Sequence, residues 1–147
     1  MALTVPLLWY FGGALFTARS FAFRDAAHYY YPLFQWTSRE WAAGRVPLWN
    51  PQENCGTPVL ADATSSVFYP GKLLFALPGT YSTKYNWYIV GHVFLAAGAA
   101  YCLARSWRCS TLAAGVAGLA YACGGNVLFQ YCNVVYLVGA AWLPLAL

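Results

Sequence analysis

The residues that decide the fold run from Arg24 to Pro70 and read RDAAHYYYPLFQWTSREWAAGRVPLWNPQENCGTPVLADATSSVFYP. This stretch contains every acidic residue of the chain, namely Asp25, Glu40, Glu53 and Asp62. The sequence on either side of it is apolar and nearly free of charge. Any chemistry that the protein performs is therefore expected in this stretch.

The composition indicates an integral membrane protein. Hydrophobic residues make up 61% of the chain and charged residues only 8%, against about 25% charged residues in an ordinary soluble domain. A net charge of +4 comes from dispersed Lys and Arg side chains. No basic run interleaved with aromatic residues is present, so nucleic acid is not an expected partner. Five cysteines form no CxxC pair and no zinc-type spacing.

Four apolar stretches predict four transmembrane helices, because about 20 apolar residues cross the hydrocarbon core of a bilayer. We expect the four spans at about residues 3–22, 85–104, 110–127 and 131–147. Gly124-Gly125-Asn126 is the break signal between the last two. A cleaved signal peptide is the competing interpretation of the first stretch, but that stretch lacks a basic n-region.

The distribution of basic residues predicts the topology. Arg105 and Arg108 lie in the shortest loop, which the positive-inside rule places in the cytoplasm. The amino terminus would then be cytoplasmic, and residues 24–84, called the polar segment below, would be extracytoplasmic. The chain is therefore expected to cross a membrane several times.

Within the polar segment, an amphipathic helix is predicted from Pro32 to Gly44. Five residues at helical spacing form its apolar face: Tyr30, Leu33, Phe34, Thr37 and Trp41. Too short to span, this helix is expected to lie along the membrane surface with that face in the headgroup layer. Four prolines then exclude regular structure over residues 45–71, and an ordered loop and a short helix near residues 71–77 are expected.

The order of motifs resembles the start of the bacterial YfhO-like membrane proteins, within the broad GT-C class of polytopic glycosyltransferases. The residues that carry the resemblance are Asp25, Tyr31-Pro32, Gly44-Arg45, Pro47-Leu48-Trp49-Asn50-Pro51, Gly56, Pro58, Leu60-Ala61-Asp62, Tyr69-Pro70 and Ala141-Trp142-Leu143-Pro144-Leu145. Proteins of that family are several times longer. We therefore expect a single all-α membrane domain over residues 1–147, as the GT-C-like amino-terminal part of a longer chain.

The resemblance implies an enzyme that moves a sugar from a polyprenyl-phosphate donor to a cell-envelope acceptor outside the cytoplasmic membrane. Membrane lipid, the donor and the acceptor are its implied partners. In such enzymes an acidic residue just after the first helix lies at the active site, and Asp25 holds that position. A carboxylate within hydrogen-bond reach of the attacking hydroxyl is a competent general base. A helix cap, or an ion pair with Arg24, is the structural alternative for Asp25.

Other polar residues of the segment are candidates for substrate binding. His28 and Asp62 are candidate polar partners of Asp25; no cofactor is predicted, although a divalent cation beside Asp25 is left open. Arg45 and Lys72 are candidates for neutralising the donor phosphate, with headgroup anchoring as the alternative. Asn50 is the last candidate, although an Asn before a Pro also fixes a turn.

Two further functions stay open at this stage. The first is a non-enzymatic polytopic membrane protein, such as a transport or assembly subunit, for which paired charges near mid-membrane are expected. Only His92 is ionisable at that depth, and we expect it to be a satisfied helix contact. The second is an inactive truncated fragment.

Overall fold

The computed structural model describes residues 3–17 and 19–147. The described chain is helical throughout and contains no strand, apart from one isolated bridge between Asn50 and Thr57. The expected all-α class is confirmed. The helical elements are α1 (Thr4–Phe16), η1 (Ala26–Tyr30), α2 (Tyr31–Ala42), η2 (Val59–Ala61), η3 (Ala63–Ser65), η4 (Pro70–Ala76), α3 (Tyr81–Ser106), α4 (Thr111–Cys123), α5 (Gly125–Leu128), η5 (Phe129–Cys132) and α6 (Val134–Ala146).

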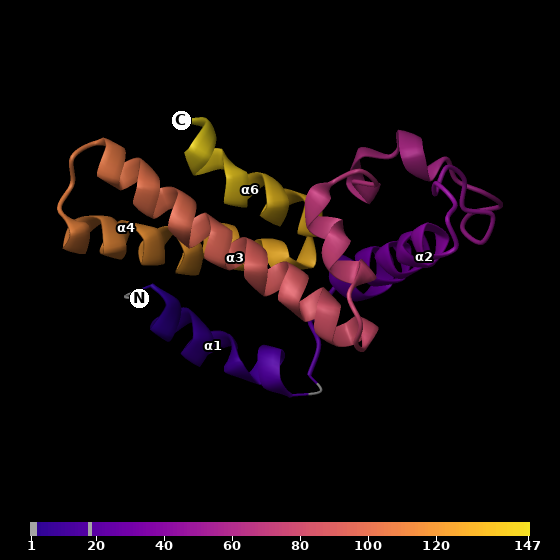
Figure 1. Ribbon diagram of the computed structural model, residues 1–147, viewed down its shortest axis with the longest axis horizontal. Helices are drawn as coiled ribbons and strands as arrows, with labels where there is room; N and C mark the ends of the chain where they lie inside the picture. Colours follow the sequence, from indigo (N-terminus) through magenta and orange to yellow (C-terminus); the bar gives the residue numbers. More distant parts are fainter. Residues whose placement is uncertain (1–2, 18) are drawn as a thin grey trace.

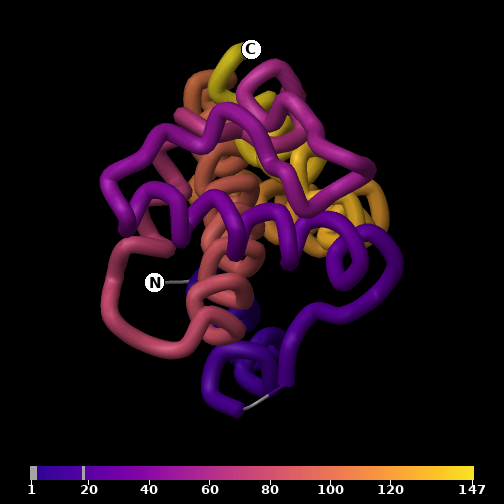
Figure 2. Tube along the Cα trace, turned by 90° about the vertical axis from the view of Figure 1, so that its right-hand side faces the viewer, coloured from indigo at the N-terminus to yellow at the C-terminus, as the bar shows by residue number. Residues whose placement is uncertain are grey.

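Two regions are separated along the long axis of the molecule (Figure 1). Helices α1, α3, α4 and α6 form an apolar bundle, and most of the polar segment lies beyond one end of it. The amino terminus and the turn between α3 and α4 lie at the opposite end (Figure 1). Figure 2, turned by 90°, shows α2 and the loop that follows it crossing in front of α3. The polar segment therefore caps one end of the bundle.

Helix α3 is the centre of the bundle and packs mainly against α4 and α6. The contact with α4 depends on small side chains. A Cβ atom added at Gly118 would lie 2.6 Å from the carbonyl oxygen of Ala97, so only glycine allows this approach. Close packing of this kind suits helices that associate without a hydrophobic driving force.

Helix α1 packs on α3 through Leu7, Phe11 and Leu15, which are spaced by four residues and buried. The helix ends at Phe16, six residues before the predicted end at residue 22, and residue 18 lies outside the described residues. The chain after α1 is held by Asn86 of α3. The Asn86 amide donates to the carbonyls of Ala14 and Arg19, so the buried side chain replaces the missing helical turns as an anchor.

The helices differ in their length relative to a bilayer. Helix α3 has 26 residues, which is about 39 Å at 1.5 Å per residue and enough to cross a core of about 30 Å. Helices α4 and α5–η5 qualify together as one broken span, bent by 43° at the glycine pair. Helices α1 and α6 are apolar but have 13 residues each. Four complete spans are therefore more than these helix lengths support.

The helical part of the polar segment differs from the prediction in position. Helix α2 ends near Gly44 as predicted, but η1 runs directly into it, so the helical course begins at Ala26 instead of Pro32. Trp41 of the predicted apolar face is 40% exposed, but its other four residues are buried: Tyr30, Leu33, Phe34 and Thr37 are at most 4% exposed. These side chains pack inside the protein, so their predicted position in the lipid headgroup layer is wrong. The short helix predicted near residues 71–77 is η4.

Candidate functional site

The polar segment is organised around the carboxylate of Asp62. Tyr29, from η1, donates its hydroxyl to Asp62 Oδ2 at 2.6 Å. Thr64 donates its backbone N–H to Asp62 Oδ1 at 2.9 Å and its hydroxyl to the same carboxylate. These bonds join two parts of the chain that are 33 residues apart. The local Asp62–Thr64 turn presents the carboxylate to Tyr29, and the tyrosine fixes the loop on the helix.

The surroundings of Asp62 determine its charge. Partial burial raises the pKa of the Asp62 carboxyl, but the hydrogen bonds from Thr64 and Tyr29 outweigh it, so its pKa is lowered overall. The pKa of the Tyr29 hydroxyl is raised by burial and by the hydrogen bond to Asp62. At neutral pH the pair is therefore a carboxylate and a neutral phenol. Three donors already engage this carboxylate, so it is a weaker candidate for the general base than a carboxylate without partners.

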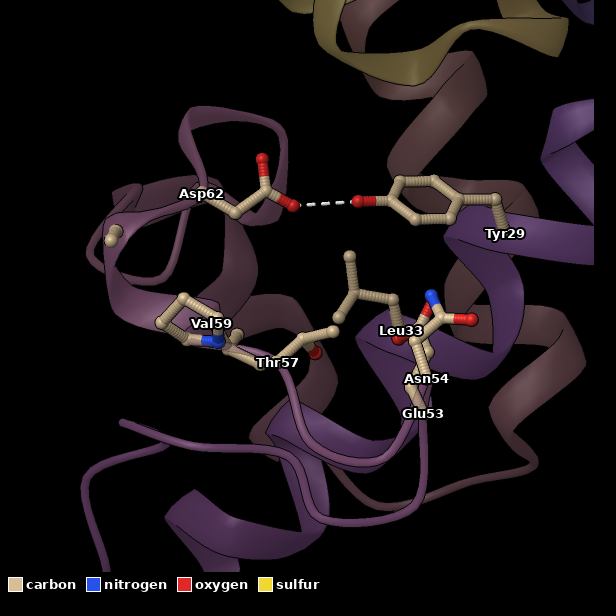
Figure 3. Close-up of a pocket in the computed structure, with 9 residues that line it drawn as sticks. Tyr29, Leu33, Glu53, Asn54, Thr57, Val59 and Asp62 are labelled. Carbon is tan, nitrogen blue, oxygen red and sulfur yellow. Dashed lines mark hydrogen bonds between the residues drawn. The ribbon is translucent and has the colours of Figure 1, made fainter.

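A pocket of about 320 Å³ lies beside this pair. Figure 3 shows Tyr29 and Asp62 meeting along one side of it, with Val59, Thr57 and Leu33 on the other. Its walls combine apolar side chains with hydroxyl, amide and carboxylate groups, and its lining contains no Lys or Arg. The lining residues are Tyr29, Leu33, Glu53, Asn54, Thr57, Pro58, Val59, Ala61 and Asp62. The volume lies at the small end of the range for small-molecule sites, which is about 300–1,000 Å³.

Lys72 is buried behind this loop instead of lining the pocket. Its ammonium donates to the carbonyl of Ser65 and lies 3.6 Å from the centre of the Phe34 ring. Burial lowers the pKa of Lys72 to about 7, although the nearby Asp62 opposes the shift. Lys72 therefore holds η3 against α2 by a hydrogen bond and a cation–π contact. Its predicted contact with a donor phosphate is not favoured by this position.

Arg45 and Asn50 also have partners within the protein. The Arg45 guanidinium forms a two-pronged contact with Glu40, with distances of 2.7 and 2.8 Å. This ion pair also accounts for an acidic residue at the edge of the apolar face of α2. Asn50 is buried and accepts from the backbone N–H of Gln52, while its backbone pairs with Thr57. Asn50 shapes the proline-rich turn and is not among the pocket-lining residues.

Asp25 and His28 lie at the start of η1 and are exposed. Within the described part of the chain, neither side chain has a hydrogen-bond or ion-pair partner, so the structural alternatives of a side-chain cap and an ion pair with Arg24 are absent. Asp25 precedes Tyr29 of the pocket by four residues, which is about one helical turn. Its carboxylate accepts none of the described hydrogen bonds, and Asp25 is not among the pocket-lining residues.

His92 is buried and satisfied, as the sequence predicted. Its Nδ1 donates to the carbonyl of Tyr88 at 2.7 Å, because a carbonyl can only accept. Its Nε2 then accepts from the Tyr69 hydroxyl at 2.8 Å, and the Tyr69 oxygen accepts from Trp142 Nε1 at 2.8 Å. These hydrogen bonds fix Tyr69, near the end of the polar segment, to α3 and α6.

Sequence reasoning missed several members of the site. Tyr29 lay in a run of three tyrosines that carries no signal to separate its role from those of its neighbours. The Asp62-x-Thr64 spacing was a readable signal for a local turn, because Asp side chains bind the backbone N–H two residues on. Glu53 lines the pocket, and its carboxylate accepts a long hydrogen bond of 3.4 Å from the Asn50 side-chain amide.

In the described ranges, no three His, Cys, Asp or Glu side chains form a group that could hold a metal ion. Comparison with known proteins gives no further assignment. No family model, curated protein or solved structure matches the chain. The function therefore rests on the residues and on the geometry described above.

Proposed function

We propose that this chain works in a membrane glycosyltransferase that moves a sugar from a polyprenyl-phosphate donor to an extracytoplasmic cell-envelope acceptor. The observation that carries the proposal is the small-molecule pocket in the polar segment, placed beside Tyr29 and Asp62 at one end of an apolar bundle. Most of the YfhO-like motifs lie in the same segment, which supports the assignment to a GT-C-type enzyme.

The outer surface of the bundle supports the membrane location. Large apolar side chains are exposed on every long helix of the bundle, including Trp9 of α1 at 85%, Leu112 of α4 at 80% and Trp107 after α3 at 70%. Exposed apolar area on this scale marks a membrane or protein contact. Arg105 and Arg108 lie at the end opposite the polar segment, which agrees with a cytoplasmic turn and an extracytoplasmic site.

The pocket suits the hydroxyl groups of a saccharide. Carboxylate, amide and hydroxyl groups accept and donate to sugar hydroxyls, and Leu33 and Val59 supply an apolar wall. The absence of Lys and Arg from its lining favours a sugar over a phosphate. In this proposal the pocket binds the acceptor sugar. Asp62 and Tyr29 then shape the pocket, and they are positioning residues.

Asp25 is the proposed general base. The attacking hydroxyl must lose its proton as the sugar leaves the polyprenyl phosphate, and a carboxylate with free lone pairs can accept that proton. Asp25 meets this requirement because its carboxylate has no partner in the described structure, whereas Asp62 already accepts from Tyr29 and Thr64. His28 follows Asp25 by three residues and is also exposed, so it stays a candidate for binding the same substrate in this proposal.

The test is sugar transfer in proteoliposomes that contain the full-length protein and a polyprenyl-phosphate sugar. Asp25→Asn is expected to lower kcat by about 10²–10⁴-fold, the usual contribution of a general base. Glu40→Gln is the matched control, because it removes a carboxylate of the same segment that is already paired with Arg45 at the surface, and it is expected to leave transfer unchanged. Full transfer by the Asp25→Asn protein would refute the catalytic role. Absence of transfer by the wild-type protein with any such donor would favour an assembly subunit.

A further inference from the structure

A second pocket, of about 290 Å³, opens in the apolar bundle between α1, α3 and the turn formed by α5 and η5. It shares no lining residue with the pocket of the polar segment. Its walls carry no charged side chain and are mostly aromatic or aliphatic. The lining residues are Tyr10, Phe11, Phe21, Ile89, Val93, Gly125, Leu128, Phe129 and Tyr131.

The rim of this second pocket is apolar as well. Tyr10 and Phe129, which line it, are more than half exposed. A hollow lined and bordered by apolar groups is costly to fill with water, because water there finds few polar partners. A hydrocarbon chain would fill it without that cost.

Arg19 is held near one end of this pocket by Asn86 of α3. The carbonyl of Arg19 accepts from Asn86 at 2.6 Å, and the backbone N–H of Phe21 donates to the same side chain at 3.3 Å. Asn86 precedes Ile89 of the pocket wall by three residues on α3, which is about one helical turn. The backbone of Arg19 is therefore held about one turn from the pocket wall.

Arg24 is placed near the same pocket by the aromatic residue before it. The Phe23 ring lies 6.5 Å from the ring of Tyr131, a pocket-lining residue. Arg19 and Arg24 are both exposed, and the one ion pair in the described residues is that of Arg45 with Glu40. With Asp25 included, residues 19–25 carry a net charge of +1. The apolar pocket thus has an unpaired positive charge beside it.

We propose that this pocket holds one hydrocarbon chain of an anionic phospholipid of the surrounding bilayer, with the lipid phosphate bound at Arg19 and Arg24. The combination of an uncharged pocket and two free guanidinium groups matches a ligand that is apolar at one end and anionic at the other. The inference rests on the membrane location proposed above and is independent of sugar transfer. Such a lipid would secure α1 and the start of the polar segment on α3.

The test is equilibrium lipid binding to the detergent-solubilised full-length protein, with native mass spectrometry as the measurement of bound lipid. The probes are dioleoylphosphatidylglycerol, dioleoylphosphatidylcholine, a polyprenyl phosphate and inorganic phosphate. The phosphatidylglycerol is expected to bind at least about fivefold more tightly than the phosphatidylcholine, the factor that one net positive charge provides. Inorganic phosphate is expected not to bind measurably, because it cannot fill the apolar pocket.

Two matched pairs of variants locate the site. Gly125→Leu fills the pocket, since a Cβ atom at Gly125 meets nothing within 4 Å, and it is expected to weaken both phospholipids about tenfold. Gly139→Leu on α6 also has open space and is the control that keeps binding intact. The pair Arg19→Gln and Arg24→Gln should remove only the preference for the anionic lipid. Arg39→Gln with Arg108→Gln should preserve it.

Several results would overturn the proposal. Equal binding of the two phospholipids by the wild-type protein would remove the role of the arginines, and full binding by Gly125→Leu would remove the pocket. Tighter binding of the polyprenyl phosphate than of the phosphatidylglycerol would assign the pocket to a different lipid. The lipid result and the transfer result are separable: a protein that binds phosphatidylglycerol but transfers no sugar retains this site and loses the proposed enzyme function.

Discussion

In the apolar bundle, α3 packs closely against α4 through alanine and glycine, whereas the polar segment is held by side chains that bond distant backbone or each other. The bundle has few polar anchors, of which Asn86 and His92 are buried. The polar segment depends on Tyr29–Asp62 and Lys72–Ser65, whereas the exposed Arg45–Glu40 pair contributes little. The stability of each region should therefore be sensitive to a different change: added side-chain volume in the bundle, and a change of charge in the polar segment.

The largest expected effect is the pH response of the polar segment through Lys72. Its pKa in the folded protein is about 7, against 10.5 for the free side chain. Between these values the unfolded chain binds a proton that the folded protein lacks, so stability rises with pH by at most about 1.4 kcal/mol per unit. We expect a gain of up to about 3 kcal/mol from pH 7 to pH 9, measured by denaturant unfolding in detergent.

Lys72→Met is expected to flatten this dependence, because it removes the titrating group. Lys84→Met is the matched control: it removes another lysine of the same segment while Lys72 is intact, and the slope should persist. A wild-type protein with constant stability over this range would show that the Lys72 ammonium is not buried as described.

The next effect tests the bundle. Gly118→Ala places a Cβ atom 2.6 Å from the Ala97 carbonyl oxygen, so α3 and α4 must separate. We expect a loss of about 1–3 kcal/mol in unfolding free energy, as is usual for overpacking. Gly115→Ala on the same helix meets nothing within 4 Å and should stabilise the helix by up to about 1 kcal/mol. Similar stabilities for the two variants would contradict the close α3–α4 contact.

The smallest effect concerns Asp62. Its pKa is lowered in the folded protein, so its contribution to stability is present above the unfolded pKa and is lost as the pH falls through the lower folded pKa. We expect hydrogen-exchange protection of residues 59–66 to fall by about 1 kcal/mol below pH 4, since much of the carboxylate is solvated. Tyr29→Phe should reduce this acid effect, whereas Tyr31→Phe should leave it unchanged. An identical acid profile for both variants would show that the Tyr29 hydrogen bond does not influence the titration of Asp62.

The sequence predicted the parts of this fold that depend on local periodicity. The face of Tyr30, Leu33, Phe34 and Thr37, the break at the glycine pair and the satisfied His92 were all readable, because helical spacing and glycine act locally. What lies against that face was not readable. Its burial under η4 and α3 depends on contacts between residues far apart in the chain.

The candidate site was less predictable for a similar reason. Asp62 was a candidate from the sequence, but its partner Tyr29 is brought to it by a loop with left-handed residues at Asn54, Cys55 and Ser66. Proline positions indicate that such a loop is irregular and do not determine its path. The burial of Lys72 likewise depends on where this loop places the Ser65 carbonyl.

The central claim is that the two ends of the molecule face opposite sides of a membrane, with the polar segment outside. Two native cysteines report on it: Cys55 is exposed in the polar segment, and Cys109 lies in the turn between α3 and α4. Variants that retain one of these two cysteines, with the others changed to alanine, would be treated with a membrane-impermeant maleimide in intact cells. The account predicts labelling of Cys55 in intact cells and of Cys109 only after permeabilisation. Labelling of Cys109 in intact cells, or recovery of the protein in the soluble fraction, would contradict it.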